Sequence, residues 1–349
     1  MLIKRLLPIV ALLVIGAGIG AAFYIKDHID SPMALSTEEI YTVPDGASLR
    51  RVLNDFEANG WIQYARAHEL WLRFQEQTAI HRGEYRLSPE DTSSSAIAKM
   101  IDGQKIQHSV QFIEGWTFRQ YLTTLAANEA VAQTLKDTDP QAVLDALEID
   151  QQHPEGWFFP DTYLFERGTT DVEILKQAYE RMQQELTRAW ENRSESTEVE
   201  TPYEALILAS IIERETGAAF ERPEIAGVFS RRLAQNMRLQ TDPTVIYGLG
   251  EDFSGNLTRS HLRQDTPYNT YTRSGLPPTP IANPGRGALE AAVDPAEGTT
   301  LFFVAKGDGT HQFSTTYEEH NEAVRQYQRF QRRDDYRSAP PPEAEGDGS

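Results

Sequence analysis

A strongly hydrophobic helix-forming stretch that ends in two carboxylates constrains this chain more than any other part of its sequence. The stretch covers residues 206–217 and carries Glu213 and Glu215 directly after a long apolar run. Pro202 suits the first turn of a helix and Gly217 suits its end. We therefore expect a buried helix of about four turns that delivers two acidic side chains to its C-terminal end.

Glu215 is the more informative of the two carboxylates. Residues three and four apart are neighbours on a helix, so Glu215 continues the apolar stripe of Ile211 and Ile212, whereas Glu213 faces another side. A carboxyl group on an apolar stripe loses solvation, which raises its pKa, and a glutamic acid protonated near neutrality can act as a general acid. The alternative is that both glutamates reach solvent at a fraying helix end.

A long uncharged stretch near the N-terminus predicts a membrane anchor. Leu6–Ile25 has 20 residues without a charge, and as a helix it spans about 30 Å, the thickness of a bilayer core. Lys4 and Arg5 precede it, so residues 1–5 are expected in the cytoplasm and the chain after Lys26 across the membrane. A cleaved signal peptide is the alternative, although its apolar region is usually shorter.

Composition excludes several classes of function. The formal net charge of −19 argues against nucleic acid as a partner, because no basic surface replaces the counterions of phosphates. The chain has no cysteine, so thiolate nucleophiles and cysteine-ligated zinc are excluded. The signatures of zinc proteases, α/β-hydrolases and P-loop enzymes are also missing from the sequence. We expect neither a metal nor a cofactor.

The order of strand and helix patterns predicts an α+β protein of several parts. After a polar tether at 26–37, a small module at 38–107 has the order strand, helix, helix, strand, helix. Residues 108–336 continue as a larger mixed α/β domain. The tail 337–349 is rich in proline, glycine and acid and is expected to be disordered.

Two further features leave alternatives open. Asp242 precedes Pro243, a pattern typical of a helix N-cap, although a capping carboxylate can also face a cleft. The aromatic segment 154–163 could pack a loop or form a wall on which sugars stack. A buried glutamate followed by segments rich in Gln, Thr, Asn and Tyr suits a carbohydrate ligand.

Several ordered motifs then carry a resemblance to one family. They occupy residues 209–216, 239–248, 268–271 and 275–285, with further matches at 155–157 and 160–162. Together they closely resemble the endolytic murein transglycosylases, the membrane-bound lytic transglycosylase G (YceG-like) family, from the anchor to about Phe330. In that family the small N-terminal module resembles a LysM domain, and the catalytic domain has a lysozyme-like glutamate site.

The resemblance implies a reaction and its residues. The family cleaves peptidoglycan between N-acetylmuramic acid (MurNAc) and N-acetylglucosamine (GlcNAc) and leaves a 1,6-anhydroMurNAc end, without a cofactor. Glu215 matches the catalytic glutamate, with Glu213 in reserve. Glu215 would protonate the glycosidic oxygen and then remove the proton of the muramyl C6 hydroxyl, so no second carboxylate is needed, unlike in ordinary glycosidases. The residues expected to bind substrate are Gln240, Thr241, Tyr247, Tyr268, Asn269 and Tyr271.

The resemblance also implies a place in the cell. We expect a single-pass protein of the inner (cytoplasmic) membrane whose bulk lies in the periplasm, beside peptidoglycan synthases (penicillin-binding proteins), where it ends the growth of new glycan strands. Two positions depart from the family pattern. Arg214 stands where lysine is common, and the segment 230–232 lacks an expected asparagine, which puts a role at Arg231 in doubt.

Two other functions remain open at this stage. A hydrolytic muramidase would use Asp242 or Glu213 as a second carboxylate. A non-catalytic scaffold would bind glycan through the small module and the aromatic loops and present it to a synthase complex. The ends left on cleaved strands separate the first alternative from a transglycosylase, and the loss or survival of cleavage in a Glu215 variant separates the second.

Overall fold

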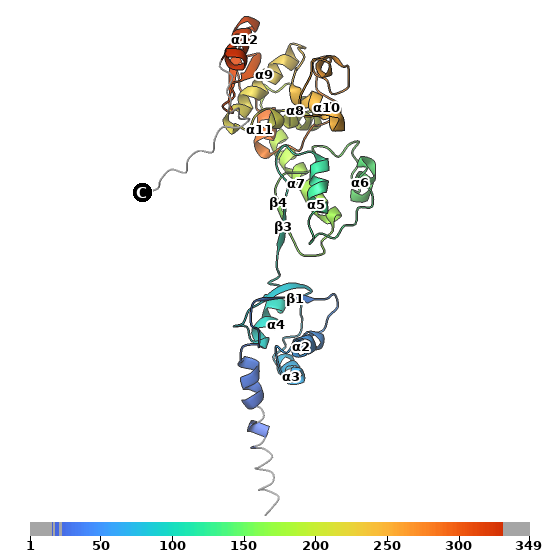
Figure 1. The fold of residues 1–349 in the computed structure, drawn as a ribbon, viewed down its shortest axis with the longest axis vertical. Coiled ribbons are helices and arrows are strands. Elements are labelled where there is room, and N and C mark those ends of the chain that lie inside the picture. The colour runs from blue at the N-terminus through green and yellow to red at the C-terminus, as the bar shows by residue number, and fades with distance from the viewer. Residues whose placement is uncertain (1–15, 17, 21–22, 331–349) are drawn as a thin grey trace, which may run out of the picture. The chain divides into compact units, whose positions relative to one another are not determined.

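The structure is a computed structural model that describes residues 16, 18–20 and 23–330 of the 349-residue chain (Figure 1). The chain divides into two compact units, and the segments that compose them are Met1–His108 with Leu164–Gly168, and Ser109–Tyr163 with Thr169–Ser349. Helices and two-stranded sheets make up the described part of the chain. This mixture confirms the predicted α+β class.

Four predicted segments lie partly or wholly outside the described residues. The predicted cytoplasmic N-terminus 1–5 and the predicted tail 337–349 lie outside entirely. Residues 6–15, 17, 21 and 22 of the predicted membrane span Leu6–Ile25 and residues 331–336 of the predicted domain 108–336 also lie outside. Among the residues that the structure does describe, no helix has the length and apolar character needed to cross a bilayer.

The first unit has the predicted order strand, helix, helix, strand, helix. Its elements are β1 (Glu39–Val43), α2 (Leu49–Ala58), α3 (Ala65–Phe74), β2 (Gly83–Leu87) and α4 (Ser93–Ile101). The two strands are antiparallel, with Tyr41 opposite Tyr85. Ser48 begins α2 by accepting a hydrogen bond from the backbone of Arg51, as expected for an N-cap serine.

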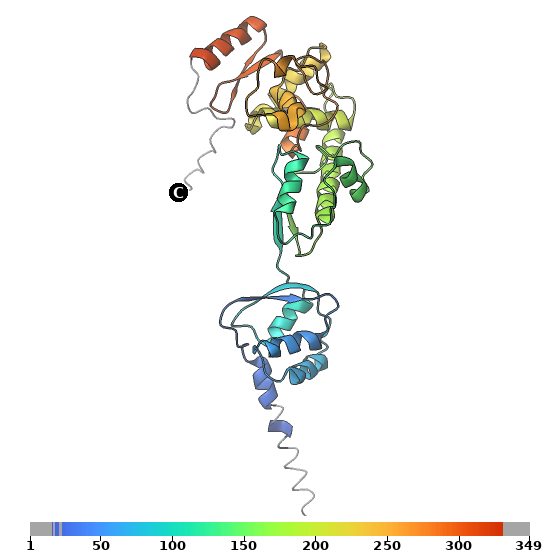
Figure 2. The same ribbon diagram turned by 45° about the vertical axis from the view of Figure 1, so that its right-hand side comes forward.

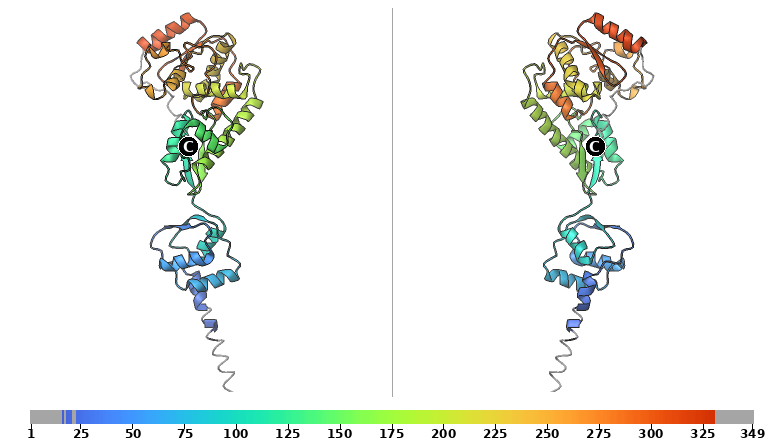
Figure 3. Two further views of the ribbon diagram at one scale, coloured as in Figure 1. Left: turned by 90° about the vertical axis from the view of Figure 1, so that its right-hand side faces the viewer. Right: turned by 90° about the vertical axis from the view of Figure 1, so that its left-hand side faces the viewer.

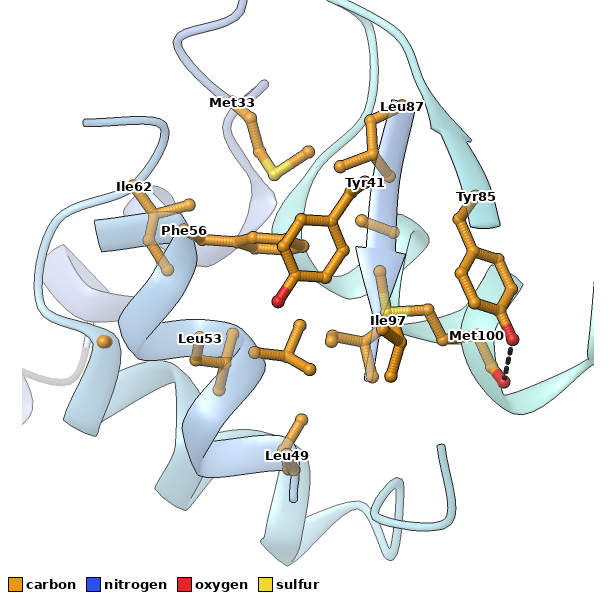
Figure 4. Packing of buried hydrophobic residues seen from close by; sticks show 14 of the residues in the cluster. Met33, Tyr41, Leu49, Leu53, Phe56, Ile62, Tyr85, Leu87, Ile97 and Met100 are labelled. Carbon is orange, nitrogen blue, oxygen red and sulfur yellow. Dashed lines mark hydrogen bonds between the residues drawn. The ribbon is translucent and has the colours of Figure 1, made fainter. Parts of the chain in front are cut away.

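The core of this unit is formed where α2 and α4 pack against the two strands (Figure 4). Phe56 of α2 meets the edge of the Tyr41 ring, with 5.0 Å between ring centroids. The buried hydroxyl of Tyr85 donates to the carbonyl oxygen of Met100 at 3.3 Å. The apolar positions that follow helical and strand periods in the sequence therefore meet in one core.

The second unit contains the remaining helices and strands, except that the strand residues His108, Leu164 and Phe165 are assigned to the first unit. The chain runs through β3 (His108–Gln111), α5 (Phe118–Ala126), α6 (Pro140–Leu147), β4 (Thr162–Phe165), α7 (Asp171–Glu191), α8 (Pro202–Glu215), α9 (Arg222–Ala234), α10 (Asp242–Leu249), α11 (Arg286–Val293), β5 (Phe302–Ala305), β6 (His311–Ser314) and α12 (Tyr317–Val324). Short 3-10 turns at Ala219–Glu221, Gly250–Asp252 and His261–Arg263 and a π-helical segment at Arg325–Phe330 complete the described part.

Helix α8 is the centre of this unit (Figures 1 and 2). It contacts α7, α9, α10 and α11, and residues 205–212 are buried on every side. Thr201 caps the helix, Pro202 occupies its first turn, and the Glu204 carboxylate accepts a hydrogen bond from the Thr201 N–H at 3.1 Å. The predicted buried helix is therefore confirmed, and its position fixes where the carboxylates at its C-terminal end can lie.

The C-terminal part adds a hairpin and a helix. Strands β5 and β6 are antiparallel, with Phe303 opposite Phe313. Helix α12 packs on both strands (Figure 3), and α9 contacts β5. The hairpin therefore extends the packing that surrounds α8 and α9.

Candidate active site

Glu215, the last residue of α8, has a desolvated carboxyl group bonded to a neutral hydroxyl. The Thr241 hydroxyl donates a hydrogen bond to Glu215 Oε1. Burial raises the pKa of Glu215 to about 7. The negative charge of Asp242 also raises this pKa, whereas the hydrogen bond from Thr241 lowers it. The residue as a whole is half-buried. A carboxyl group that is half protonated near pH 7 can both give and take a proton.

Thr241 is held in place by a cluster of buried threonines. Its backbone N–H donates to Thr270 Oγ1 at 3.0 Å, and the Thr244 hydroxyl donates to its carbonyl oxygen at 2.9 Å. The preceding residue, Gln240, donates its N–H to the Thr270 carbonyl at 3.1 Å and has a φ of 52°. That left-handed conformation is uncommon for a residue with a side chain. The cluster thus fixes the hydroxyl that meets Glu215.

Asp242 and Tyr271 form a second contact beside Glu215. Helix α10 begins at Asp242 and its N-cap is Thr241, so the prediction that Asp242 is the capping residue is wrong by one position. The Asp242 carboxylate instead accepts a hydrogen bond from the Tyr271 hydroxyl at 2.5 Å. Burial raises the pKa of Tyr271, with contributions from Asp242 and from Glu215. Tyr271 therefore lies within electrostatic reach of Glu215.

The other predicted binding residues divide into two kinds. Tyr247 and Tyr268 pack edge to face, with 5.1 Å between ring centroids, and their hydroxyl groups bond to other side chains. Asn269 is buried, and its amide group donates to the carbonyl oxygens of His261 and Gln264 at 3.1 and 2.7 Å. Its side chain therefore holds the backbone of its own loop, and Tyr247 and Tyr268 are better placed to meet a ligand.

Glu213, the reserve candidate, contacts a guanidinium group and a backbone N–H. Its carboxylate pairs with Arg222 at 2.8 Å and accepts the N–H of Gly285 at 2.9 Å, and its side chain is 5% exposed. Burial raises the pKa of Glu213, while Arg222 and the Gly285 N–H lower it. These contacts tie α8 to α9 and to the start of α11, which is a structural role.

Two residues beside these candidates escaped the sequence reasoning. Arg232 of α9 is buried and donates to the carbonyl oxygens of Leu239 and Leu301, each at 2.7 Å. Its positive charge lowers the pKa of Glu215, which opposes the effect of burial. Glu155 is also buried, and burial raises its pKa to about 7. Glu155 lies in the aromatic segment 154–163 and in the family match at 155–157, but neither signal assigned it a role.

Comparison with known proteins decides the family. The model of the YceG-like family matches residues 41–326. The chain belongs to the YceG-like family. The resemblance that the motifs around Glu215 indicated is therefore confirmed.

Relatives of this YceG-like chain carry a consistent description. A protein of Bacillus subtilis (strain 168) described as endolytic murein transglycosylase is 29% identical over 88% of this chain and 91% of its own length. A protein of Streptococcus pneumoniae serotype 2 with the same description is 24% identical over 87% of this chain and 61% of its own length. Among solved structures, the YceG-like protein lmo1499 of Listeria monocytogenes is similar, with a TM-score of 0.50 and 30% identity over 82% of this chain and 99% of that one.

Proposed function

We propose that this YceG-like protein is an endolytic lytic transglycosylase that cuts the MurNAc–GlcNAc bond of nascent peptidoglycan and leaves 1,6-anhydroMurNAc ends. Family membership and the curated relatives support the coarser statement that it is a lytic transglycosylase acting on peptidoglycan. The observation that supports the specific cleavage reaction is the carboxyl group of Glu215, which has a pKa of about 7 and accepts a hydrogen bond from a hydroxyl group.

The proposed reaction needs one group that works first as an acid and then as a base. Protonated Glu215 gives its proton to the glycosidic oxygen while the bond from that oxygen to C1 of MurNAc breaks. The C6 hydroxyl oxygen of the same sugar then bonds to C1, and the Glu215 carboxylate takes the hydroxyl proton. The acid is restored, and neither water nor a second carboxylate takes part.

The surroundings of the nearby acids favour this reaction over hydrolysis. A hydrolytic muramidase needs a second carboxylate as nucleophile or as base for water. Glu213 is paired with Arg222 and bonded to Gly285, and Asp242 accepts the Tyr271 hydroxyl. Both alternative carboxylates are thus engaged by protein groups, which supports a mechanism that relies on Glu215.

End-group analysis of digested peptidoglycan tests the proposal. Purified sacculi are treated with the protein or with Glu215→Gln, and the new ends are identified by mass spectrometry. We expect anhydroMurNAc ends from the unchanged protein and a loss of new ends with the variant. New reducing ends would refute a transglycosylase in favour of a muramidase, and an absence of cleavage by the unchanged protein would favour the scaffold.

The cellular setting completes the proposal. The uncharged stretch Leu6–Ile25 after Lys4 and Arg5 supports a single-pass anchor in the inner membrane with the bulk of the chain in the periplasm. There the residue 38–107 module would be a LysM-like part of the protein, and cleavage beside peptidoglycan synthases would end strand growth. Two fusions after residue 337 test the orientation, one to a reporter active only in the periplasm and one to a reporter active only in the cytoplasm. We expect a signal from the periplasmic reporter, and a signal only from the cytoplasmic reporter would contradict the orientation.

A further inference from the structure

A cavity of about 1070 Å³ lies in the second unit beside the C-terminal end of α10. Helix α5, the start of α6, the turn at 153–155 and Tyr268 form its other walls. Its volume is at the upper end of the range for sites that enclose small ligands. None of its lining residues takes part in the acid–base steps assigned to Glu215, so the cavity calls for a separate explanation.

A buried acid lines this cavity and orients one of its aromatic walls. Glu155 is 4% exposed. Its Oε1 accepts the backbone N–H of Phe118 at 2.8 Å and the amide of Asn283 at 3.4 Å. Its Oε2 accepts the Tyr247 hydroxyl at 3.1 Å. Because the carboxyl group is anchored on one side, the hydrogen bond on the other fixes the direction of the Tyr247 ring.

The aromatic walls are packed into fixed positions. The Tyr247 and Tyr268 rings meet at 63°, and the Tyr268 hydroxyl lies 2.8 Å from Thr279 Oγ1. Gly248 permits this close approach, because a Cβ there would lie 2.8 Å from Tyr268 Cβ. Tyrosines held in this way offer an apolar ring face and a hydroxyl group together. A sugar ring presents the complementary surface, with an apolar C–H face and hydroxyl or amide groups at its edge.

The charges around the cavity select against an anionic ligand. Asp137, Asp139 and Glu251 contribute to its lining. Arg119 also lines the cavity, but its charge is paired with Glu251. Burial lowers the pKa of His153, which leaves that ring uncharged at neutral pH. The acidic groups of the lining would repel a peptide stem that carries free carboxylates, whereas they would not repel an N-acetylated saccharide without charge.

Helix α10 connects the cavity to Glu215. Its N-terminal residue follows Thr241, which bonds to Glu215, and Tyr247 in its last turn lines the cavity. From Asp242 to Tyr247 the helix rises by about 8 Å. We propose that the cavity walled by Tyr247 and Tyr268 is a saccharide subsite that binds N-acetylhexosamine rings of the glycan strand away from the bond being cut. The inference rests on the proposed function for the identity of that strand.

A pair of neighbouring alanines provides a matched test. Ala126 lines the cavity and Ala127 does not, and both residues are exposed. In full-length protein carrying Glu215→Gln to prevent turnover, Ala126→Trp fills the cavity while Ala127→Trp adds the same side chain outside it. Binding of tetra-N-acetylchitotetraose is measured by isothermal titration calorimetry. We expect Ala126→Trp to weaken binding at least about tenfold and Ala127→Trp to leave it unchanged.

A second variant keeps the test independent of any damage that tryptophan does to the fold. Tyr247→Phe keeps the ring and removes only the hydroxyl that Glu155 accepts, and we expect binding about threefold weaker. Equal affinity in both tryptophan variants, no binding of the tetrasaccharide, or binding of the free stem peptide in its place would overturn the subsite.

Failure of the subsite is distinguishable from failure of the proposed function. If the unchanged protein produced no anhydro ends but tetrasaccharide binding still depended on Ala126, the proposed function would fail and the saccharide subsite would stand. If anhydro ends formed while the tetrasaccharide bound equally to both tryptophan variants, the subsite would fail and the proposed function would stand.

Discussion

Glu213 and Glu215 are two residues apart on α8, yet their carboxyl groups meet opposite surroundings. Glu213 faces Arg222 at 2.8 Å and the Gly285 N–H at 2.9 Å. Glu215 faces the hydroxyl of Thr241. Burial raises the pKa of both carboxyl groups. At Glu213 the Arg222 guanidinium and the Gly285 N–H oppose this rise, whereas at Glu215 the pKa reaches about 7.

The difference shows how one helix end can supply one acid that stabilises the fold and another that can transfer a proton. A carboxyl group that receives contacts from two neighbouring elements holds those elements together, whereas one whose pKa lies near 7 can exchange a proton at neutral pH. The buried apolar body of α8 provides the desolvation for both. What separates them is which neighbouring element each side chain reaches.

The largest expected effect is the loss of cleavage in Glu215→Gln. Glutamine keeps the shape of the side chain but can neither give nor take the proton, so we expect the rate of strand cleavage to fall about 10³-fold. Release of anhydroMurNAc ends measures the rate, and the thermal midpoint shows that the variant is folded. Unchanged cleavage would contradict the comparison, because Glu215 would then not be the residue that transfers the proton.

Glu213→Gln should instead act on stability. It leaves Arg222, whose side chain is 13% exposed, without its shorter carboxylate contact, and removing one partner of a buried pair costs about 3 kcal/mol. Chemical denaturation measures the free energy of unfolding. The matched control is Glu114→Gln, because Glu114 pairs with the same arginine at 3.3 Å but is 47% exposed, and we expect a loss below about 1 kcal/mol.

A Glu213→Gln variant that unfolds normally but loses cleavage would reverse the two assignments. The acid of the reaction would then be Glu213, and the hydroxyl-bonded Glu215 would be the structural residue.

The pH dependence of stability sharpens the comparison further. Burial raises the folded-state pKa of Glu215 to about 7 from an ordinary value of 4.5. Between these values the folded protein keeps a proton that the unfolded chain releases, so stability falls as the pH rises through this window. We expect Glu215 to contribute about 2 kcal/mol to this fall.

The measurement compares denaturation of the unchanged protein and Glu215→Gln at pH 5 and pH 8. The variant should be the relatively more stable protein at pH 8, because it has no carboxylate to bury. Parallel stability curves for the two proteins would mean that the carboxyl of Glu215 is solvated.

The smallest expected effect comes from Thr241→Val. Valine has a similar shape, but it removes the hydroxyl that donates to Glu215. That hydrogen bond lowers the pKa of Glu215, so its loss should raise the pKa and move the alkaline limb of the cleavage profile upward. We expect the rate to fall about fivefold from lost orientation. Thr244→Val removes a neighbouring hydroxyl that donates to the Thr241 carbonyl. It acts on Glu215 only through Thr241, so it should move the limb less than Thr241→Val does.

Much of the framework could be predicted from the sequence. The apolar run before Glu213 and Glu215 predicted the buried α8, because a helix that is hydrophobic on all sides must be enclosed by protein. The pattern of apolar residues predicted the order of strands and helices in the first unit. The motifs around Glu215 indicated the family. These features depend on local periods and on residue order, which a sequence displays directly.

The tertiary structure decided which polar groups meet. Thr241 lies 26 positions after Glu215, Gly285 lies 72 after Glu213, and Tyr247 lies 92 after Glu155. Each contact depends on how far one element turns over another, and neither propensity nor periodicity contains that information. The sequence by itself determined that an acid would end a buried helix and which family the chain resembles. Only the folded chain decided that Glu215 would meet a hydroxyl and Glu213 a guanidinium, because partners distant in sequence are brought together by packing.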